Sequence, residues 1–490
     1  MTTPAAPDSL RVKVMGGLRW KLLSQLVAQG SRIAVGILLA HLLTPKQFGL
    51  AAMALIFTGL AGIFSDLSLG SALVQRSTIT EQDRSTVFWT TAGSGLIMTA
   101  IGIGIAPLMG RFFSTPEVVP LFAAASALTF ISGLAVTQMA LLTRELNFRS
   151  LELRGICSVL VGIVPAVAMA FTGFGAWAIV TQALCTAAVS TGLVWHLSPW
   201  RPQWIYSRAS FRTLGSFGVK TLFSRLLGYF ETNADNLLIG HYLGSRPLGV
   251  YSVAFNLMFQ PLGLIAQPIQ QVLFAAFVKL KGETDRLGQA WLRGTQLVAA
   301  INVPAFLGIA VVAPDFVPSI LGPQWNAAVP VLQLLSLAGA VHTLQTLNWS
   351  VMQAMGQPGR LLRFMTFSSC LTVAAFALGL RWGVVGVAGL YAVARATSVV
   401  CFIWLTCRTV GLPVLHFVRS VSWVLALSIP MAICVYLARL ALVHEGLSTG
   451  ARLALEVLLG TGVYGALFVW RAPELLSDVR DLVRQRRYVS

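Results

Sequence analysis

Charged and amide side chains recur at helical spacing in the first apolar segment, at residues 17–43. Lys21 and Arg32 are eleven residues apart, so on an α-helix they lie within about 20° of each other. Gln25 and Gln29 fall on the same side, which makes a polar stripe about 16 Å long. Charged groups inside membrane-length segments normally face a cavity or a partner. Arg19 adds charge before the stripe, although Arg19 and Lys21 could instead anchor the helix at the membrane surface.

A second apolar segment, at residues 212–242, is polar around much of its circumference. Its candidate residues are Lys220, Ser224, Arg225, Glu231, Asn233 and Asp235. Arg and Lys bind phosphate and pyrophosphate, and amides suit hydroxyl-rich ligands. Acidic groups in the same cavity could bind Na⁺ or protons and couple transport to an ion gradient. The alternative is that the basic and acidic residues only pair with one another and hold the bundle together.

Other polar residues in apolar segments are isolated. Asp66 is a third candidate for ion coupling, although structural roles for Asp66 and Arg395 are the stronger expectation. Glu456, near the start of the last segment, is expected at the membrane interface. The six cysteines have no metal-ligand spacing, so we expect buried thiols, no disulfide and no metal. No catalytic residues and no organic cofactor are expected.

The composition shows which classes of protein could contain these residues. The chain has 490 residues, of which 56% are hydrophobic and 11% charged, against about 25% charged in soluble globular proteins. This excludes a soluble enzyme, a disordered chain and a small disulfide-stabilised domain. The net charge of +18 comes from basic residues between apolar segments, which indicates loops on one side of a bilayer and not a nucleic-acid partner.

Fourteen apolar segments are separated by turn residues. They cover residues 17–43, 47–73, 86–109, 118–142, 154–173, 175–198, 212–242, 247–278, 289–312, 327–355, 361–380, 383–406, 418–441 and 451–470. If the N-terminus is cytoplasmic, the loops expected inside hold most of the 35 Lys and Arg residues. We therefore expect an all-α, multi-pass protein of the bacterial inner membrane with both termini in the cytoplasm.

The chain repeats itself at an offset of 200 residues. Residues 22–54 share nine identities with residues 222–254, among them His41 with His241 and Gly49 with Gly249. Six segments separate the copies, so the repeat is parallel, a known plan of transporters. The expected domains are an N-terminal lobe (1–200), a C-terminal lobe (201–410), two added helices (411–470) and a basic cytoplasmic tail (471–490). Corresponding polar stripes indicate a shared central cavity.

Several stretches resemble bacterial polysaccharide exporters of the Wzx type. They are LLTPKQFGLAAMALIFTGLAGIFSDLSLGSALVQR (42–76), LLTRELNFRSL (141–151), GFGAWAIVTQAL (173–184), NADNLLIGHYLGSRPLGVYSVAFNLM (233–258) and LGPQWNAAVPVLQLLSLAG (321–339). Together they resemble the colanic-acid-exporter and teichuronic-acid branch of the multidrug/oligosaccharidyl-lipid/polysaccharide superfamily. The resemblance implies two six-helix bundles in a V and flipping of undecaprenyl-pyrophosphate-linked oligosaccharides for exopolysaccharide or lipopolysaccharide synthesis. It also implies a lipid bilayer and a polysaccharide polymerase with its export machinery as partners.

The resemblance carries a role over to matching basic positions. Family members use Arg and Lys residues of the cavity, and the matching ones here are Arg19, Lys21, Arg32, Lys220 and Arg225. Two rival hypotheses remain. A drug or cation antiporter of the same superfamily would favour an acidic, aromatic cavity, and a membrane enzyme would need a large outer loop or an acidic metal-binding motif. Alternating access with a cationic cavity that binds pyrophosphate is the leading interpretation.

Overall fold

The computed structural model describes residues 29–76 and 78–471, and all their regular secondary structure is helical. Each of the fourteen predicted segments coincides with helix, the first from residue 29 onward. Within these residues eleven runs are long and apolar enough to cross a membrane, and the run Pro358–Val410 contains two long α-helices. Helix α9 (Arg208–Leu243) is not among the eleven because its many polar residues lower its hydropathy. The prediction of an all-α, multi-pass membrane protein is confirmed.

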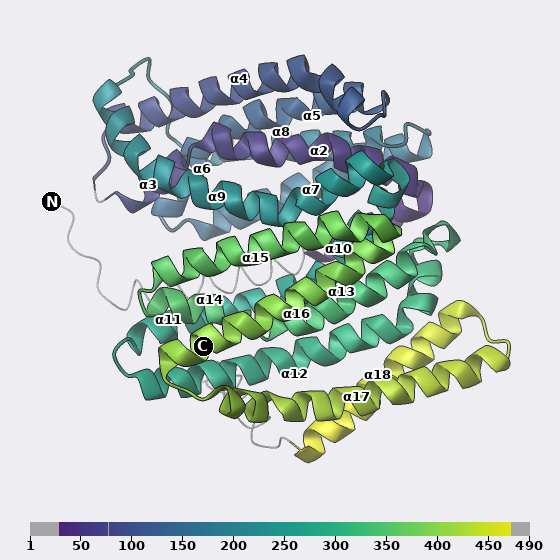
Figure 1. Ribbon diagram of the computed structural model, residues 1–490. Helices are drawn as coiled ribbons and strands as arrows, with labels where there is room; N and C mark the ends of the chain where they lie inside the picture. Colours follow the sequence, from purple (N-terminus) through teal and green to yellow (C-terminus); the bar gives the residue numbers. More distant parts are fainter. Residues whose placement is uncertain (1–28, 77, 472–490) are drawn as a thin grey trace. The chain divides into compact units, whose positions relative to one another are not determined.

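The chain divides into two compact units, Met1–Ser252 and Val253–Ser490. The first unit contains helical residues 29–42 and the helices α2 (Pro45–Asp66), α3 (Leu69–Gln75), α4 (Glu81–Phe112), α5 (Val118–Gly133), α6 (Val136–Arg144), α7 (Phe148–Phe171), α8 (Trp177–Leu197), α9, and the start of α10 (Ser245–Pro261). Helix α2 packs against α4, α5 and α9, while α7 pairs with α8 (Figure 1). The predicted lobes at 1–200 and 201–410 remain a prediction.

Two membrane-length segments of the first unit are each broken into a long and a short helix. Helix α2 ends at Asp66, and Leu67 (φ 47°) and Ser68 (φ 57°) turn the chain into α3. Helix α5 similarly gives way to α6 at residues 134–135. The short helices α3 and α6 pack against each other. The breaks leave backbone groups and small side chains facing one another in a region that straight helices would fill.

The second unit repeats this pattern. Its helices are η1 (Leu262–Ala266), α11 (Gln267–Lys279), α12 (Thr284–Phe316), η2 (Val317–Leu321), η3 (Pro323–Trp325), α13 (Ala328–Thr343), α14 (Asn348–Ala354), α15 (Pro358–Gly379), η4 (Leu380–Trp382), α16 (Gly383–Val410), α17 (Val414–His444) and α18 (Thr449–Arg471). The π-helix η1 interrupts the segment that starts with α10, and residues 344–347 separate α13 from α14. Helix α11 packs against α14, as α3 packs against α6. The second and fourth segments of both predicted lobes are therefore interrupted.

The two copies of the sequence repeat meet at their matching glycines. A Cβ atom on Gly49 would overlap the carbonyl group of Ser245, and one on Gly249 would overlap the carbonyl group of Pro45. Positions 45 and 245 are equivalent under the offset of 200 residues. The contact is thus reciprocal, as expected where a pseudo-two-fold axis passes between two equivalent helix starts. Both glycines are needed because any side chain would push the backbones apart.

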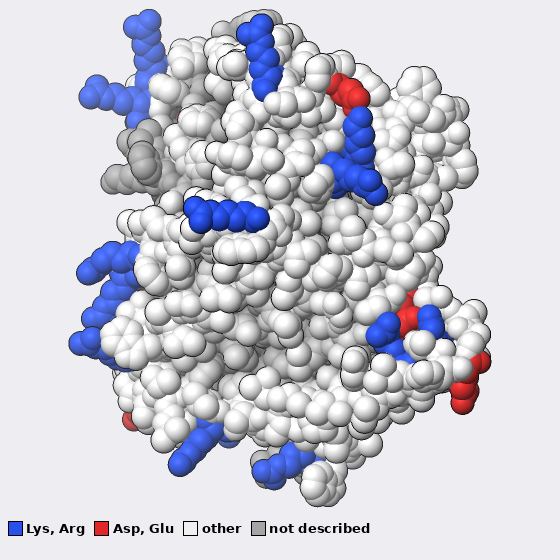
Figure 2. All heavy atoms as spheres, turned by 45° about the vertical axis from the view of Figure 1, so that its right-hand side comes forward, with Lys and Arg blue, Asp and Glu red and all other residues white. Residues whose placement is uncertain are grey.

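Charged side chains are sparse on the face shown in Figure 2, and most stand towards its edges with a broad uncharged area between them. This distribution suits a surface that meets hydrocarbon at its centre and water at its rims. Many large apolar side chains of the described residues are exposed, among them Val164 (68%), Phe171 (68%) and Leu458 (69%). In a soluble protein such exposure would promote aggregation, whereas in a bilayer these side chains contact hydrocarbon.

Candidate functional site

Arg225 and Asp66 form an ion pair in the first unit. The Nη1 atom of Arg225 lies 2.5 Å from Oδ2 of Asp66, and its Nη2 atom donates to the hydroxyl of Ser71 at 3.3 Å. Asp66 ends α2, and its Oδ1 atom accepts from the backbone N–H of Gly70 at 3.4 Å. The two side chains are 38% and 23% exposed, so the pair is reachable without being fully solvated. Since a guanidinium carries five N–H donors, Arg225 can bind a further anion.

Close packing of α9 on α2 sets the position of Arg225. One turn further along α9, the hydroxyl of Tyr229 donates to the carbonyl oxygen of Ile56. The ring of Tyr229 lies over Gly59, where a Cβ atom would come within 2.6 Å of a ring carbon. Glycine at this position lets the two helices approach, and the approach holds the guanidinium of Arg225 at the break that ends α2.

A cavity of about 440 Å³ opens beside this ion pair. Its lining comes from Asp66, Gly70, Ser71, Val74, Gln75, Val136, Met139, Ala140 and Thr143. The cavity thus lies where the broken segments α2–α3 and α5–α6 face each other. Its volume falls in the usual range for small-ligand sites, and its polar lining residues are Asp66, Ser71, Gln75 and Thr143.

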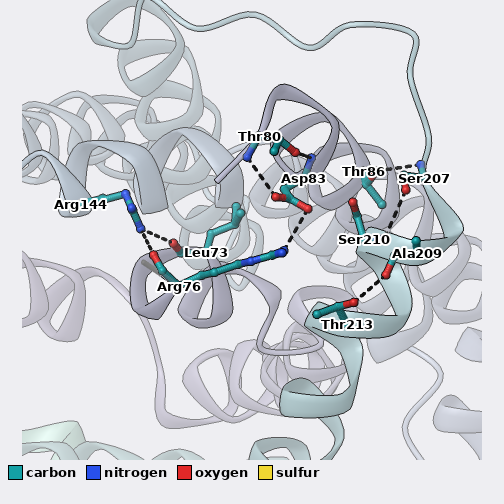
Figure 3. A network of polar contacts seen from close by, with 10 residues as sticks. All are labelled: Leu73, Arg76, Thr80, Asp83, Thr86, Arg144, Ser207, Ala209, Ser210 and Thr213. Carbon is teal, nitrogen blue, oxygen red and sulfur yellow. Dashed lines mark hydrogen bonds and ion pairs between the residues drawn. The ribbon is translucent and has the colours of Figure 1, made fainter. Parts of the chain in front are cut away.

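A polar network fixes the short helices that build this cavity (Figure 3). Asp83 caps α4 by accepting from the N–H of Thr80 at 3.0 Å, and its other oxygen lies 3.1 Å from Nη1 of Arg76. From α6, Arg144 donates to the carbonyl oxygens of Arg76 and Leu73, the latter at 3.2 Å. The N–H of Ser207 donates to Thr86 at 3.0 Å, which ties the start of α9 to α4. The ends of α3, α4, α6 and α9 are therefore held together.

The first predicted stripe is only partly described. Arg32 is exposed, and its Nη1 atom lies 3.5 Å from Oε1 of Gln29, a contact at the limit of hydrogen bonding. Arg19, Lys21 and Gln25 lie outside the described residues. Arg32 and Gln29 do lie on one side of their helix, as their spacing requires.

The acidic and amide candidates of α9 differ in environment. Asp235 is fully buried, with one carboxylate oxygen accepting from the N–H of Asn236 at 2.7 Å and the Tyr251 hydroxyl close by. Glu231 is half-buried, and the amide of Asn233 donates to the carbonyl of Tyr229 on its own helix at 3.0 Å. For Lys220 only the backbone, within α9, is described. Among the predicted site residues that the structure describes, Arg225 pairs with Asp66, and Arg32 lies beside Gln29.

Sequence reasoning missed a charged cluster in the second unit. Asp315 is 1% exposed and lies 2.5 Å from Nε of Arg439 and 2.8 Å from Nη2 of Arg452. Glu456, expected at the membrane interface, is 1% exposed beside this cluster, a burial that the sequence did not predict. Its place near a helix start could not reveal the burial, because α12 and α17 supply the neighbours. Arg395 is 8% exposed and donates to the Tyr391 hydroxyl at 3.2 Å, which suits a structural role.

Metal-binding chemistry finds little support in the part of the chain that is described. No group of three or more His, Cys, Asp or Glu residues within residues 29–76 and 78–471 could hold a metal ion. All six cysteines are free thiols, but the expectation that they are buried is wrong for most of them: Cys157, Cys370 and Cys434 are exposed, and only Cys407 is buried.

Comparison with known proteins decides the family. A family model described as "Polysaccharide biosynthesis protein" matches residues 38–330, which is more than half of the chain. The chain belongs to this polysaccharide biosynthesis family. Its members are membrane transport proteins and not enzymes, in agreement with the resemblance seen in the sequence.

Individual relatives extend the match. The chain is 28% identical to lipopolysaccharide biosynthesis protein WzxC of Escherichia coli (strain K12), over 76% of each chain. It is 26% identical to teichuronic acid biosynthesis protein TuaB of Bacillus subtilis (strain 168), over 96% of this chain and 98% of that one. The solved structure of the lipid II flippase MurJ, inward closed, matches with a TM-score of 0.76 at 14% identity over 94% of this chain and 100% of that chain. At that identity the last match establishes the fold.

Proposed function

We propose that this protein flips undecaprenyl-pyrophosphate-linked oligosaccharide repeat units across the bacterial inner membrane for exopolysaccharide or lipopolysaccharide synthesis. Family membership supports the pathway, because WzxC and TuaB bear names of polysaccharide biosynthesis. The shared fold with a protein named as a lipid II flippase supports the movement of a lipid-linked saccharide. The observation within the chain that carries the proposal is Arg225, a partly exposed cation inside an apolar bundle, beside a cavity.

The chemistry of Arg225 suits a pyrophosphate. A guanidinium binds phosphate oxygens through two parallel N–H donors, and the low dielectric of the bundle strengthens the contact. Asp66 holds Arg225 while no substrate is present and so avoids an uncompensated charge in the membrane. The incoming pyrophosphate would replace Asp66 as the partner. The amides and hydroxyls along the helices would then meet the sugars, while the polyprenyl chain stays in lipid.

The movement itself would be alternating access, with the cavity open first to the cytoplasm and then to the outside. In this proposal Arg19, Lys21, Gln25, Gln29, Arg32, Lys220 and Asn233 join Arg225 in lining the path. Asp235, Glu231 and Asp66 are the candidates for coupling to Na⁺ or H⁺. Asp235 is the strongest of them because it is fully buried with one oxygen directed away from its backbone partner. Both termini are placed in the cytoplasm.

Lipid analysis of a deletion strain tests the proposal. In cells whose glycan assembly is intact, deletion of the gene should cause completed undecaprenyl-pyrophosphate oligosaccharide to accumulate in mass spectra of lipid extracts. Complementation with the wild-type gene should clear it. Complementation with Arg225→Ala should not, whereas the matched Arg381→Ala variant, at an exposed arginine of another helix end, should. Accumulation of incomplete intermediates, or a change in drug sensitivity alone, would refute the proposal.

A further inference from the structure

The linker at residues 198–207, which joins α8 to α9, lies along the first turns of α4. It has no helix or strand of its own, yet side chains of α4 hold its backbone in place. The N–H of Gln203 donates to the Ser85 hydroxyl at 3.1 Å, and the carbonyl oxygen of Gln203 accepts from the Trp89 indole at 2.8 Å. The linker is therefore a fixed part of the surface of the first unit.

This fixed linker and the start of α9 present apolar side chains outward. Trp204 stacks on Trp89 with ring centroids 4.3 Å apart, but Trp204 is 89% exposed. Ile205, Tyr206 and Phe211 are exposed as well. Trp and Tyr side chains with an apolar body and a polar tip suit the boundary between an apolar medium and water. A cluster of such side chains that is held in place on the surface indicates a site of interaction.

The length of α4 places the linker at the edge of the hydrocarbon. The helix has 32 residues, or about 48 Å, whereas the hydrocarbon of a bilayer is about 30 Å thick. Its charged residues lie within its first four positions and at Arg111 near its end, so it is centred and extends about 9 Å beyond the hydrocarbon on each side. Ser85 and Trp89 lie about 6 Å and 12 Å from its start. The linker that they hold therefore spans the boundary where Trp and Tyr are enriched in membrane proteins.

The same surface carries only positive charge. Residues 198–213 contain three arginines and no Asp or Glu. Arg201 donates to two carbonyl oxygens of its own linker, at 2.6 and 2.8 Å. Arg208 and Arg212 are exposed, one turn apart on α9, and neither side chain has an ion-pair or hydrogen-bond partner among the described residues. They stand at the start of their helix, where the helix dipole disfavours cations, so they do not serve to stabilise α9.

The two free arginines stand on the water side of the aromatic rings. The exposed ring of the linker stacks on Trp89, whereas the N–H of Ser207, at the start of α9, donates to Thr86 at 3.0 Å (Figure 3). Thr86 is nearly one turn closer to the charged end of α4 than Trp89. Helical side chains point back towards the start of their helix, so Arg208 and Arg212 are directed away from the hydrocarbon. From the inside outward the order is ring and then guanidinium, as it is acyl chain and then phosphate in a phospholipid.

We propose that residues 200–212 bind anionic phospholipids of the leaflet that meets this end of the bundle. Arg208 and Arg212 pair with the negatively charged head groups, while Trp204 and Ile205 lie among the uppermost acyl carbons. An acidic protein surface would satisfy the arginines, but it would leave these apolar side chains at the depth of the hydrocarbon edge without a matching partner. A leaflet that contains anionic lipid is apolar at one depth and negative at the next, which suits both sets of residues.

Fluorescence quenching in vesicles tests this surface with the full-length protein. A fluorophore is attached at Ile205→Cys in a background with the six native cysteines replaced. Phosphatidylcholine vesicles contain either nitroxide-labelled phosphatidylcholine or nitroxide-labelled phosphatidylglycerol at the same mole fraction. Both lipids should quench the label, and the anionic one at least about fivefold more strongly, since each arginine near the surface favours an anionic lipid by about that factor.

Two pairs of exposed arginines supply matched variants. The double variant Arg208→Gln, Arg212→Gln should bring the ratio of quenching by the two lipids to about one. The double variant Arg360→Gln, Arg363→Gln, at the exposed start of α15, should keep the wild-type ratio. If the first variant did not fold, salt at about 1 M should still lower the wild-type ratio, because the Debye length falls to about 3 Å.

Three results would overturn the proposal. Equal quenching by the two lipids in the wild type would exclude a preference for anionic phospholipid. A wild-type ratio that persisted at high salt and without the two arginines of α9 would mean that these arginines do not bind the head groups. A label that neither lipid quenches would mean that residues 200–212 face water or a protein partner.

Discussion

At the residue scale, removal of Asp66, the partner of Arg225, distinguishes a structural role of Arg225 from a role in substrate binding. If Arg225 and Asp66 only stabilise the first unit, Asp66→Asn should leave the partly exposed Arg225 without its carboxylate partner, and the additional change Arg225→Gln should restore function. If Arg225 binds pyrophosphate, Arg225→Gln should reduce flipping by about tenfold or more in both backgrounds, because charge-assisted bonds to substrate are lost. The two single variants and the double variant are compared by the amount of accumulated lipid-linked oligosaccharide. Recovery in the double variant would contradict substrate binding.

Asp83 permits a second prediction at this scale, concerning stability. Its carboxylate caps α4 and pairs with Arg76, and the Asp83 side chain itself is 3% exposed. Asp83→Ala should lower the free energy of unfolding by about 1–3 kcal/mol, since the helix cap made by a buried carboxylate is lost, and the ion pair with the partly exposed Arg76 adds little to this. The control is Glu283→Gln, which removes an exposed pair with Arg286 and should cost at most about 0.5 kcal/mol. Unfolding in detergent, followed by tryptophan fluorescence, measures both; equal effects would show that the network in Figure 3 adds nothing.

At the element scale, the crossing of α2 and α10 depends on two glycines. Gly49→Ala should force the backbone at position 49 away from that of Ser245 and lower the free energy of unfolding by about 1–3 kcal/mol. Gly249→Ala should behave alike because the contact is reciprocal. The control is Gly62→Ala in the same helix α2, where a Cβ meets nothing within 4 Å and the change should stabilise by up to about 1 kcal/mol. Thermal unfolding ranks the three variants. An equal effect at Gly62 would show that the close contact between α2 and α10 does not require glycine.

The interrupted helices show what local sequence does not reveal. Leu67 and Ser68 adopt left-handed backbone angles without being Gly or Asn, so the break after Asp66 carries no turn signal. Hydrophobicity alone predicts one continuous segment at 47–73, and the same holds at 118–142. The breaks arise because α3 and α6 pack on each other, a contact between residues far apart in the chain. The cavity beside Arg225 was therefore not predictable, whereas its charged residues were.

At the scale of the whole molecule, the sequence predicted the helical segments and their repeat, but it missed the contacts between side chains of different helices. The fourteen segments and the membrane class followed from hydropathy, since each helix carries its own signal. The match of Gly49 with Gly249 predicted equivalent helix starts, and these do meet. The pairing of Asp66 with Arg225, 159 residues apart, depends instead on which faces of α2 and α9 pack against each other. The burial of Glu456 was missed for the same reason, because its neighbours Asp315 and Arg439 lie on other helices.

The orientation of the repeat gives a prediction for the complete chain. In a parallel repeat, Lys46 and Arg246, which are equivalent at the offset of 200, lie on the same side of the membrane. Basic loops on the cytoplasmic side then place both outside, and place Arg149 and Arg286 inside. Single cysteines at these four positions, in a background with the six native cysteines replaced, should react differently with a membrane-impermeant maleimide.

Lys46→Cys and Arg246→Cys should react in intact cells, and Arg149→Cys and Arg286→Cys only after the membrane is made permeable. Lys46 is paired with Glu117 on the surface, and both it and Arg246 are exposed, so access does not limit labelling. Labelling of Lys46→Cys without Arg246→Cys would mean an inverted repeat and would remove the equivalence of the two polar stripes. Labelling of only Arg149→Cys and Arg286→Cys in intact cells would keep the repeat but reverse the protein in the membrane. In that case the Arg225 cavity would open to the outside first, and an inward-loaded pyrophosphate could not be its ligand.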